Sequence, residues 1–295
     1  MAAEPHPKTP YPPLIVNAAI TGMVPRRDRV PHLPETPEQI VADAVACHEA
    51  GATIVHLHAR DEDGAPTWRR EVYEEFVAEI RRRCPGLVIC VTTSGRDFGE
   101  LERRMDVLDL EGDAKPDMAS LTLGSLNFRD GPSVNSIADI EALAARMRDA
   151  GIKPELEVFD SGMAAMAGRL LDQGALEGPV YVNVLLGNAN TAPARARNLV
   201  HLVDELPPGS VWAAAGLGGY QLPMSGLAVF MGGHVRTGLE DNPYWDHATR
   251  EPATNERLVR RVAELAEAAG RRLATAEETR AMLDLAPAAV ESQPA

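Results

Sequence analysis

Two histidines separated by one residue, His56 and His58, lie in a short apolar stretch over residues 52–61. The stretch is rich in β-branched residues and leads into the polar residues 61–64, which is typical of a buried strand. Because successive side chains alternate between the faces of a strand, both imidazoles point the same way, with Cα atoms about 6.6–7 Å apart. At this spacing they can bind one metal ion, or form a hydrogen-bonded pair in the core. Arg60 continues on the same face.

A carboxylate that could complete a metal site lies much later in the chain. Residues 234–240 are predicted to form the last strand, with Glu240 at its end. In a closed barrel this strand lies beside the first one and one place from the histidine strand, so Glu240 can face both histidines. Two histidines and a carboxylate leave open positions on a metal ion; zinc is expected, with iron(II), manganese or cobalt as alternatives. His234 shares this face but lies about 20 Å lower in an unbroken strand, so we expect a structural role.

Other polar side chains at the predicted strand ends could bind or activate a substrate. Arg236 and Asp241 flank Glu240 and could form a base with its orienting cation, a clamp for a substrate carboxylate, or a structural ion pair. Hydroxyls at such positions could bind a substrate carboxylate or a developing oxyanion. The candidate substrate-binding residues are Arg60, Thr92, Ser120 and Thr122. The remaining polar residues at these ends are Asn17, Thr21, Thr93, Glu157 and Asn183.

The elements that would carry these residues alternate between strand and helix. Strands are predicted at 14–20, 52–61, 87–92, 118–122, 155–159, 180–185, 211–215 and 234–240. Helices are predicted at 37–50, 70–83, 98–108, 136–150, 162–173, 193–205 and 224–231, with two more at 255–269 and 276–285. Eight such alternations predict an α/β fold, a TIM barrel with extra C-terminal helices; a doubly wound open sheet is the competing interpretation. We expect a single domain over residues 1–295, with its core at about 14–285.

The composition argues against several classes of partner. A formal net charge of −14 and a pI near 5.0 disfavour binding to nucleic acid or to an anionic membrane surface. The three cysteines, Cys47, Cys84 and Cys90, form no closely spaced pair, which favours a reducing, cytoplasmic compartment. Residues 1–13 are proline-rich and polar, unlike a signal peptide, and no apolar run is long enough to span a bilayer.

Five stretches of the sequence resemble motifs of the β-keto acid cleavage enzyme family. They are residues 18–22, 31–34, 55–60, 123–128 and 233–242, and the resemblance extends from about residue 14 to residue 285. It implies a zinc-dependent TIM barrel, usually a homotetramer, that condenses a β-keto acid with acetyl-CoA as co-substrate. The implied products are acetoacetate and a new CoA thioester.

The resemblance also implies roles for particular residues. The positions that match the family's zinc ligands are His56, His58 and Glu240. Arg236 and Asp241 match the pair that activates the substrate, and Thr92 and Ser120 keep hydroxyls for the carboxylate of the keto acid. The family member that cleaves 3-keto-5-aminohexanoate has a glutamate for the substrate's amino group where this chain has Val24.

Val24 therefore argues against a cationic substrate tail, and we expect an uncharged or apolar one. A negatively charged tail would require an arginine of the loop over residues 26–29 to turn inward. The residues themselves are consistent with the implied reaction, because a β-keto acid can chelate a Lewis-acid metal and a base such as Asp241 could remove its Cα proton.

Two other functions remain open at the level of the sequence. One is a metal-dependent hydrolase or retro-aldol lyase on the same barrel without CoA; amidohydrolase-type sites, however, usually carry His-x-His on the first strand, and here it is on the second. The other is a non-catalytic ligand-binding barrel, which is disfavoured because all three proposed metal ligands are present.

Overall fold

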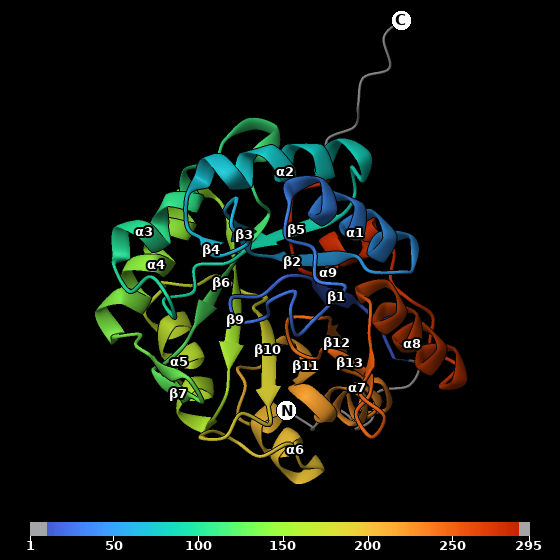
Figure 1. Ribbon diagram of the computed structural model, residues 1–295. Helices are drawn as coiled ribbons and strands as arrows, with labels where there is room; N and C mark the ends of the chain where they lie inside the picture. The colour runs from blue at the N-terminus through green and yellow to red at the C-terminus, as the bar shows by residue number, and fades with distance from the viewer. Residues whose placement is uncertain (1–10, 289–295) are drawn as a thin grey trace, which may run out of the picture.

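The eight strands predicted from the sequence close into a parallel barrel (Figure 1). The computed structural model describes residues 11–288, so the predictions for residues 1–10 and for the tail over 289–295 lie outside the described residues. The strands are β1 (Val16–Ala19), β2 (Ile54–Leu57), β5 (Val88–Val91), β6 (Met118–Thr122), β9 (Lys153–Val158), β10 (Tyr181–Leu186), β11 (Val211–Gly216) and β12 (His234–Thr237). The TIM barrel is confirmed, and the open sheet is excluded because β1 pairs with both β2 and β12.

Helices surround the barrel on all sides (Figure 1). They are α1 (Pro37–Glu49), α2 (Arg70–Arg83), α3 (Leu101–Met105), α4 (Ile137–Ala150), α5 (Ser161–Asp172), α6 (Ala196–Asp204), α7 (Gln221–Phe230), α8 (Asn255–Ala268) and α9 (Ala276–Met282), with short 3-10 helices η1 (Asp106–Asp109), η2 (Gly112–Ala114) and η3 (Gly218–Tyr220). α1 begins at Pro37, as predicted, because Thr36 forms a capping box with Gln39. Within residues 11–288, no helix is long and apolar enough to cross a membrane.

Two strands that lead to candidate residues are shorter than predicted. The predicted strand over 52–61 divides into β2 and β3 (Ala59–Arg60), and β3 pairs antiparallel with β4 (Pro66–Thr67). The predicted strand over 234–240 ends at Thr237, because Gly238 adopts a φ of 150° and the chain turns there. His58 and Glu240 therefore follow their strands rather than lying in them.

Other differences from the predicted elements are local. The helix predicted over 98–108 consists of the five-residue α3 and the 3-10 helix η1, and no side chain caps the start of α3. The sequence does not predict two hairpins, β7 (Leu126–Phe128) with β8 (Gly131–Ser133) and β13 (Tyr244–Asp246) with β14 (Glu251–Pro252). Strands of two or three residues are too short to show an alternating apolar pattern.

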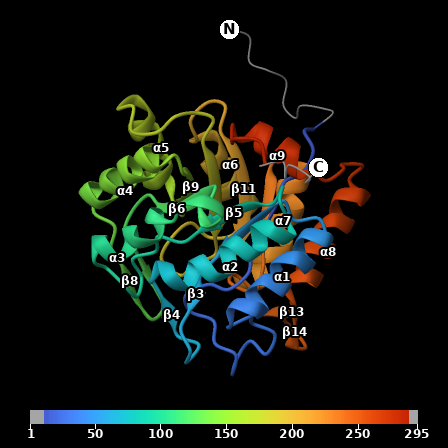
Figure 2. The same cartoon turned by 90° about the horizontal axis from the view of Figure 1, so that it is seen from above.

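The two C-terminal helices, α8 and α9, differ in role. α8 packs against α1, α7, β1 and β12, so it is the eighth helix of the outer ring. Figure 2 places α9 at the opposite end of the barrel from the β3–β4 and β13–β14 hairpins. Leu283, just after α9, packs with the buried residues Ile15, Ile54, Val88 and Met118, which lie at or next to the starts of strands. We call these five residues the floor, and the opposite end, where the strands finish, the mouth.

Candidate active site

Three side-chain atoms from distant parts of the chain converge at the mouth. His56 Nε2 and His58 Nε2 lie 3.1 Å apart. Glu240 Oε2 lies 3.7 Å from His56 Nε2 and 3.3 Å from His58 Nε2. The structure thus brings together the three residues that the sequence singles out as candidate metal ligands.

Thr21 and two glycines hold the backbone around these side chains. The Thr21 hydroxyl accepts a hydrogen bond from His58 N at 2.7 Å and lies 3.0 Å from His58 O. A Cβ on Gly22 would lie 2.7 Å from Cγ of Glu240, and a Cβ on Gly238 would lie 2.0 Å from a carbonyl oxygen of β1. Both glycines also have positive φ, so no other residue would let the segment bearing Glu240 approach β1 so closely.

The second ring nitrogen of His56 is bound by Glu155, a residue that the sequence analysis does not select. Glu155, in β9, is fully buried, and its Oε2 lies 2.6 Å from His56 Nδ1, while Asn17 donates to its Oε1. Burial opposes ionisation, but the charges of His56 and Arg236 lower the pKa of Glu155 to about 2, so it remains a carboxylate. Such a partner fixes the tautomer of a histidine and leaves Nε2 free for a metal ion.

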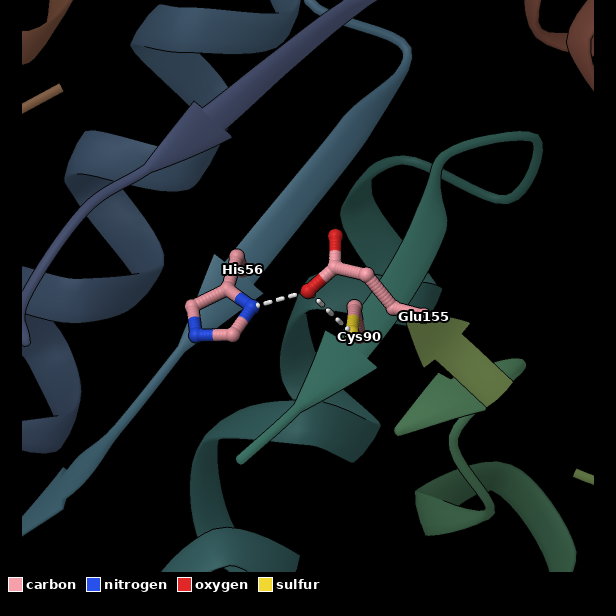
Figure 3. Close-up of side chains that lie close together, drawn as sticks. All are labelled: His56, Cys90 and Glu155. Carbon is pink, nitrogen blue, oxygen red and sulfur yellow. Dashed lines mark hydrogen bonds and ion pairs between the residues drawn. The ribbon is translucent and has the colours of Figure 1, made fainter. Parts of the chain in front are cut away.

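A second group of potential metal ligands also includes His56 and consists of His56, Cys90 and Glu155 (Figure 3). Figure 3 shows His56 and Cys90 directed at the same carboxylate oxygen, Oε2 of Glu155, at 2.6 and 3.3 Å. Burial raises the pKa of the Cys90 thiol well above its usual range, so it donates to Glu155 as a neutral thiol. This trio is therefore a hydrogen-bond network that orients His56.

The first group, His56, His58 and Glu240, fits a divalent metal ion. Among residues 11–288, no group hydrogen-bonds to Glu240 Oε2, although this atom is buried. Burial lowers the pKa of His58, so its imidazole is neutral, as a ligand must be. Two nitrogens and one carboxylate oxygen beside a cavity match the donor set of a catalytic zinc site with an open position.

Arg236 joins Glu240 to the other carboxylates of the site. It is buried, with Nη2 2.7 Å from Glu240 Oε1, Nε 3.1 Å from Asp241 Oδ2 and Nη1 3.4 Å from Glu157 Oε1. Burial raises the pKa of Asp241 and that of Glu157, although the guanidinium opposes the change. The pair expected from the sequence, Arg236 with Asp241, is thus part of a larger buried network.

The candidate substrate-binding residues occupy different places. Thr92 and Thr122 line a cavity of about 270 Å³ at the mouth, together with His58, Arg236 and the two carboxylates that follow β12. Ser120 lies behind Thr92, with its Oγ 3.5 Å from Thr92 Oγ1, and is not among the described residues that line this cavity. The volume suits a small metabolite rather than a drug-sized ligand.

Arg60 also lies outside the lining of the cavity among residues 11–288. Its guanidinium donates to the carbonyl oxygens of Gly22, Pro25 and Gly64, at 2.8, 2.9 and 2.8 Å. Arg60 therefore fixes the loop over residues 22–25, which forms one wall of the cavity.

The site also contains two residues that sequence reasoning missed besides Glu155. Asn255, at the start of α8, accepts a hydrogen bond from Leu239 N at 2.7 Å and so holds the turn that carries Glu240. Arg96 lines the cavity from the segment after β5. The alternation of Glu155 with Glu157 on one strand face is a signal that could have found Glu155; Asn255 and Arg96 have no comparable pattern.

An eight-stranded barrel with chemically active residues at the carboxyl ends of its strands is typical of the TIM-barrel enzymes. A sequence profile of the beta-keto acid cleavage enzyme family matches residues 13–285, and the chain belongs to this family.

Individual relatives agree with this assignment. The chain is 39% identical to the 3-keto-5-aminohexanoate cleavage enzyme of Fusobacterium nucleatum, with 92% of this chain and 98% of that protein covered. It is 38% identical to the 3-oxoadipate:acetyl-CoA acetyltransferase of Cupriavidus necator, with 92% and 95% covered. The apo structure of ObcA, 22% identical, superposes with a TM-score of 0.77 over 86% of this chain and 66% of that one, which shows the fold alone. The family resemblance drawn from the motifs is confirmed, and with it a carbon–carbon bond-cleaving acyltransferase.

Proposed function

We propose that the chain is a zinc-dependent β-keto acid cleavage enzyme with acetyl-CoA as co-substrate. The carboxymethyl unit of the keto acid passes to the acetyl group, giving acetoacetate, and the remaining acyl group passes to CoA as a new thioester. The observation that carries the proposal is the convergence of His56, His58 and Glu240 beside the Arg236–Asp241 pair in a chain of this family. The printed name of the Cupriavidus relative, an acetyl-CoA acetyltransferase, supports the co-substrate.

The residues of the site divide the work of this reaction. A bound divalent ion supplies Lewis-acid polarisation of the keto acid. Thr92 presents its hydroxyl to the substrate carboxylate, and Thr122, whose hydroxyl donates to Glu157 Oε2 at 2.6 Å, contacts the substrate from the same cavity wall. Asp241, held by Nε of Arg236, takes a proton from the α-carbon or from a group beside it. Glu155 keeps His56 in one tautomer.

In this proposal, two of the candidate substrate-binding residues position other parts of the site and do not contact the substrate themselves. Ser120 accepts a hydrogen bond from Thr93 N and lies against the hydroxyl of Thr92, so it positions Thr92. Arg60 positions the loop over residues 22–25.

Acetyl-CoA would enter through a second hollow that adjoins the cavity. This hollow has a volume of about 750 Å³ and shares Val24, Arg96 and Glu240 with the cavity. Arg29 lines it and could meet the phosphates of CoA, although Asp28 lies beside it. Arg26 also lines it, but its guanidinium donates to the carbonyls of Met23 and Pro25.

The quaternary state and the compartment are further parts of the proposal. Tyr220, Leu222 and Phe230 in and beside α7 are exposed by 49, 44 and 61%, which supports a homo-oligomer, with a tetramer expected. All three cysteines are free and buried, which supports a reducing cytoplasm. We also keep residues 14–285 as the core of a single domain.

The test is turnover by the purified protein after metal analysis. The protein is incubated with acetyl-CoA and a panel of β-keto acids, and acetoacetate is measured by mass spectrometry. We expect acetoacetate from at least one acid, lost in His56→Ala and Glu240→Ala and kept in the control His201→Ala, an exposed histidine of α6. Cleavage without acetyl-CoA would instead indicate the hydrolase or retro-aldol reaction, and no turnover with metal bound would overturn the proposal.

A further inference from the structure

Arg96 occupies a place in the cavity that the proposed reaction does not use. It lines both the cavity and the adjoining hollow, and Met23, Val24 and Pro25 do the same on the opposing loop. Its guanidinium carbon lies 3.9 Å from the centre of the Phe128 ring, and only 18% of its side chain is exposed. The cation is therefore held in a fixed place by an aromatic face.

The guanidinium of Arg96 lacks a close acceptor. No residue in the described range 11–288 accepts a hydrogen bond from it, and the nearest carboxylate, Asp130, is 3.9 Å away and 70% exposed. Three other arginines nearby are engaged: Arg236 by carboxylates, Arg60 by backbone carbonyls, and Arg26 by the carbonyls of Met23 and Pro25. Arg29 lines the adjoining hollow but not the cavity. Arg96 is thus a partly buried cation that borders the cavity.

The wall that leads to Arg96 is apolar. Val24, Leu126, Phe128 and Phe159 line the same cavity, so a hydrocarbon tail can extend along them. A cationic tail would be repelled by Arg96, and a wholly apolar tail would cover the guanidinium while its only charged partner among residues 11–288 within 4 Å is Asp130, at 3.9 Å. A carboxylate at the end of the tail avoids the repulsion and gives the guanidinium a partner, because its two oxygens match the paired donors of a guanidinium.

We propose that the substrate is a β-keto acid with a second carboxylate at the end of its tail, which Arg96 binds. The inference rests on the proposed function and departs from the expectation of an uncharged tail. It also places the cation in the segment after β5, whereas the sequence suggested the loop over residues 26–29. Because the phosphates of CoA are a second possible anion for Arg96, the experiment separates the two.

The test compares two six-carbon acids, 3-oxoadipate, with a terminal carboxylate, and 3-oxohexanoate, without one. We expect kcat/KM with acetyl-CoA to favour 3-oxoadipate, and Arg96→Leu to reduce this preference about 10–100-fold, the range of one charge-assisted bond. Arg96→Lys should restore part of the preference, since it keeps the charge but not the paired donors. The matched control is Arg257→Leu, which removes an arginine of α8 that is stacked on Trp245 of β13.

The other possible results of this experiment separate a failure of the inference about Arg96 from a failure of the proposed function. If Arg96→Leu raises the KM for acetyl-CoA and leaves the preference unchanged, Arg96 binds CoA and the inference fails. If the wild-type protein prefers 3-oxohexanoate, the inference also fails while the proposed function stands. If neither acid turns over, calorimetry without acetyl-CoA decides: Arg96-dependent binding of 3-oxoadipate supports the inference although the proposed reaction has failed, and equal binding of both acids overturns it.

Discussion

The mouth and the floor of the barrel are equally buried but differ in chemistry. The floor residues Ile15, Ile54, Val88, Met118 and Leu283 are all 0% exposed, and at the mouth His56, Glu155 and Arg236 are at most 1% exposed. The floor is apolar and gains stability from the area removed from water. The mouth instead buries a guanidinium among four carboxylates, at 2.7 to 3.7 Å.

The difference indicates what each end is for. A buried ionic network is seldom more stable than apolar residues of the same volume, because desolvation of the charges offsets their attraction. The same strands carry apolar residues at their starts, so the barrel could have been filled in this way at both ends. We infer that the mouth keeps its charges for chemistry, and that the floor, closed by α9, supplies stability.

The largest expected effect comes from removing a proposed metal ligand at the mouth. Glu240→Gln keeps the shape of the side chain but removes the charge that faces His56 and His58. We expect bound metal, measured by mass spectrometry, to fall at least about tenfold and kcat/KM to fall at least about 1,000-fold, since a Lewis acid supplies several kcal/mol to the transition state. Glu264→Gln, at an exposed position of α8, is the control. Unchanged metal content in Glu240→Gln would show that the metal site has been assigned incorrectly.

At the floor, the expected effect is on stability and not on turnover. Leu283→Ala leaves a cavity among fully buried residues, and we expect the free energy of unfolding to fall by about 2–5 kcal/mol in urea titrations. Ile137→Ala, at a position of α4 that is 52% exposed, should change it little. We expect kcat/KM in the folded Leu283→Ala protein to stay within about threefold of wild type. An equal loss of activity would contradict the separation of the two ends.

The next prediction concerns Glu155, which lies against His56 inside the barrel. Glu155→Gln retains a hydrogen-bonding oxygen but removes the carboxylate charge that faces His56 Nδ1. Partners of this kind contribute about 10–100-fold to metal affinity, so we expect the metal Kd to rise by that factor in competition with a chelator. Glu157→Gln is matched in strand and face but has no bond to His56, and its metal affinity should be nearly unchanged. Equal effects of the two variants would show that His56 is not oriented by Glu155.

The fold was predictable because a local apolar run in the sequence indicates each strand of the barrel. The alternation with helices gave the barrel, and Thr36 with Pro37 marked the start of α1. The division of 52–61 was not predictable, because His58 leaves the strand for a tertiary reason, its bonds to Thr21. The end of the last strand at Thr237 likewise depends on how Gly238 meets β1.

The candidate site was predictable where spacing or motif carries the chemistry, as for His56, His58 and the residues after β12. Arg60 and Ser120 were chosen because they stand at strand ends, but position in a strand does not determine whether a side chain reaches the cavity or the backbone behind it. Arg96 and Asn255 lie in segments without periodicity. Only the closed barrel shows what they contact, so no local pattern could have selected them.

The smallest expected effect concerns Asp43 and Asn255, two helix residues outside the barrel that hold the turn carrying Glu240. Asn255, which binds Leu239 N, also donates to Asp43 of α1 at 2.6 Å. Burial raises the pKa of Asp43 from 3.8 to about 6, so the unfolded chain ionises first and the free energy of unfolding falls as pH rises from 3.8 to 6. Asp43→Asn removes this titration but can keep the bond to Asn255.

The Asp43→Asn protein should therefore gain stability relative to wild type, by about 1–2 kcal/mol, between about pH 4.5 and pH 7.5 in urea titrations. Glu264→Gln again serves as the control, since it changes an exposed carboxylate outside the strut formed by Asp43 and Asn255. If the difference between Asp43→Asn and wild type does not change with pH, Asp43 is not a strained carboxylate. In that case Asp43 and Asn255 hold the turn that carries Glu240 without destabilising the folded protein. Buried charges that lower stability would then be confined to the mouth.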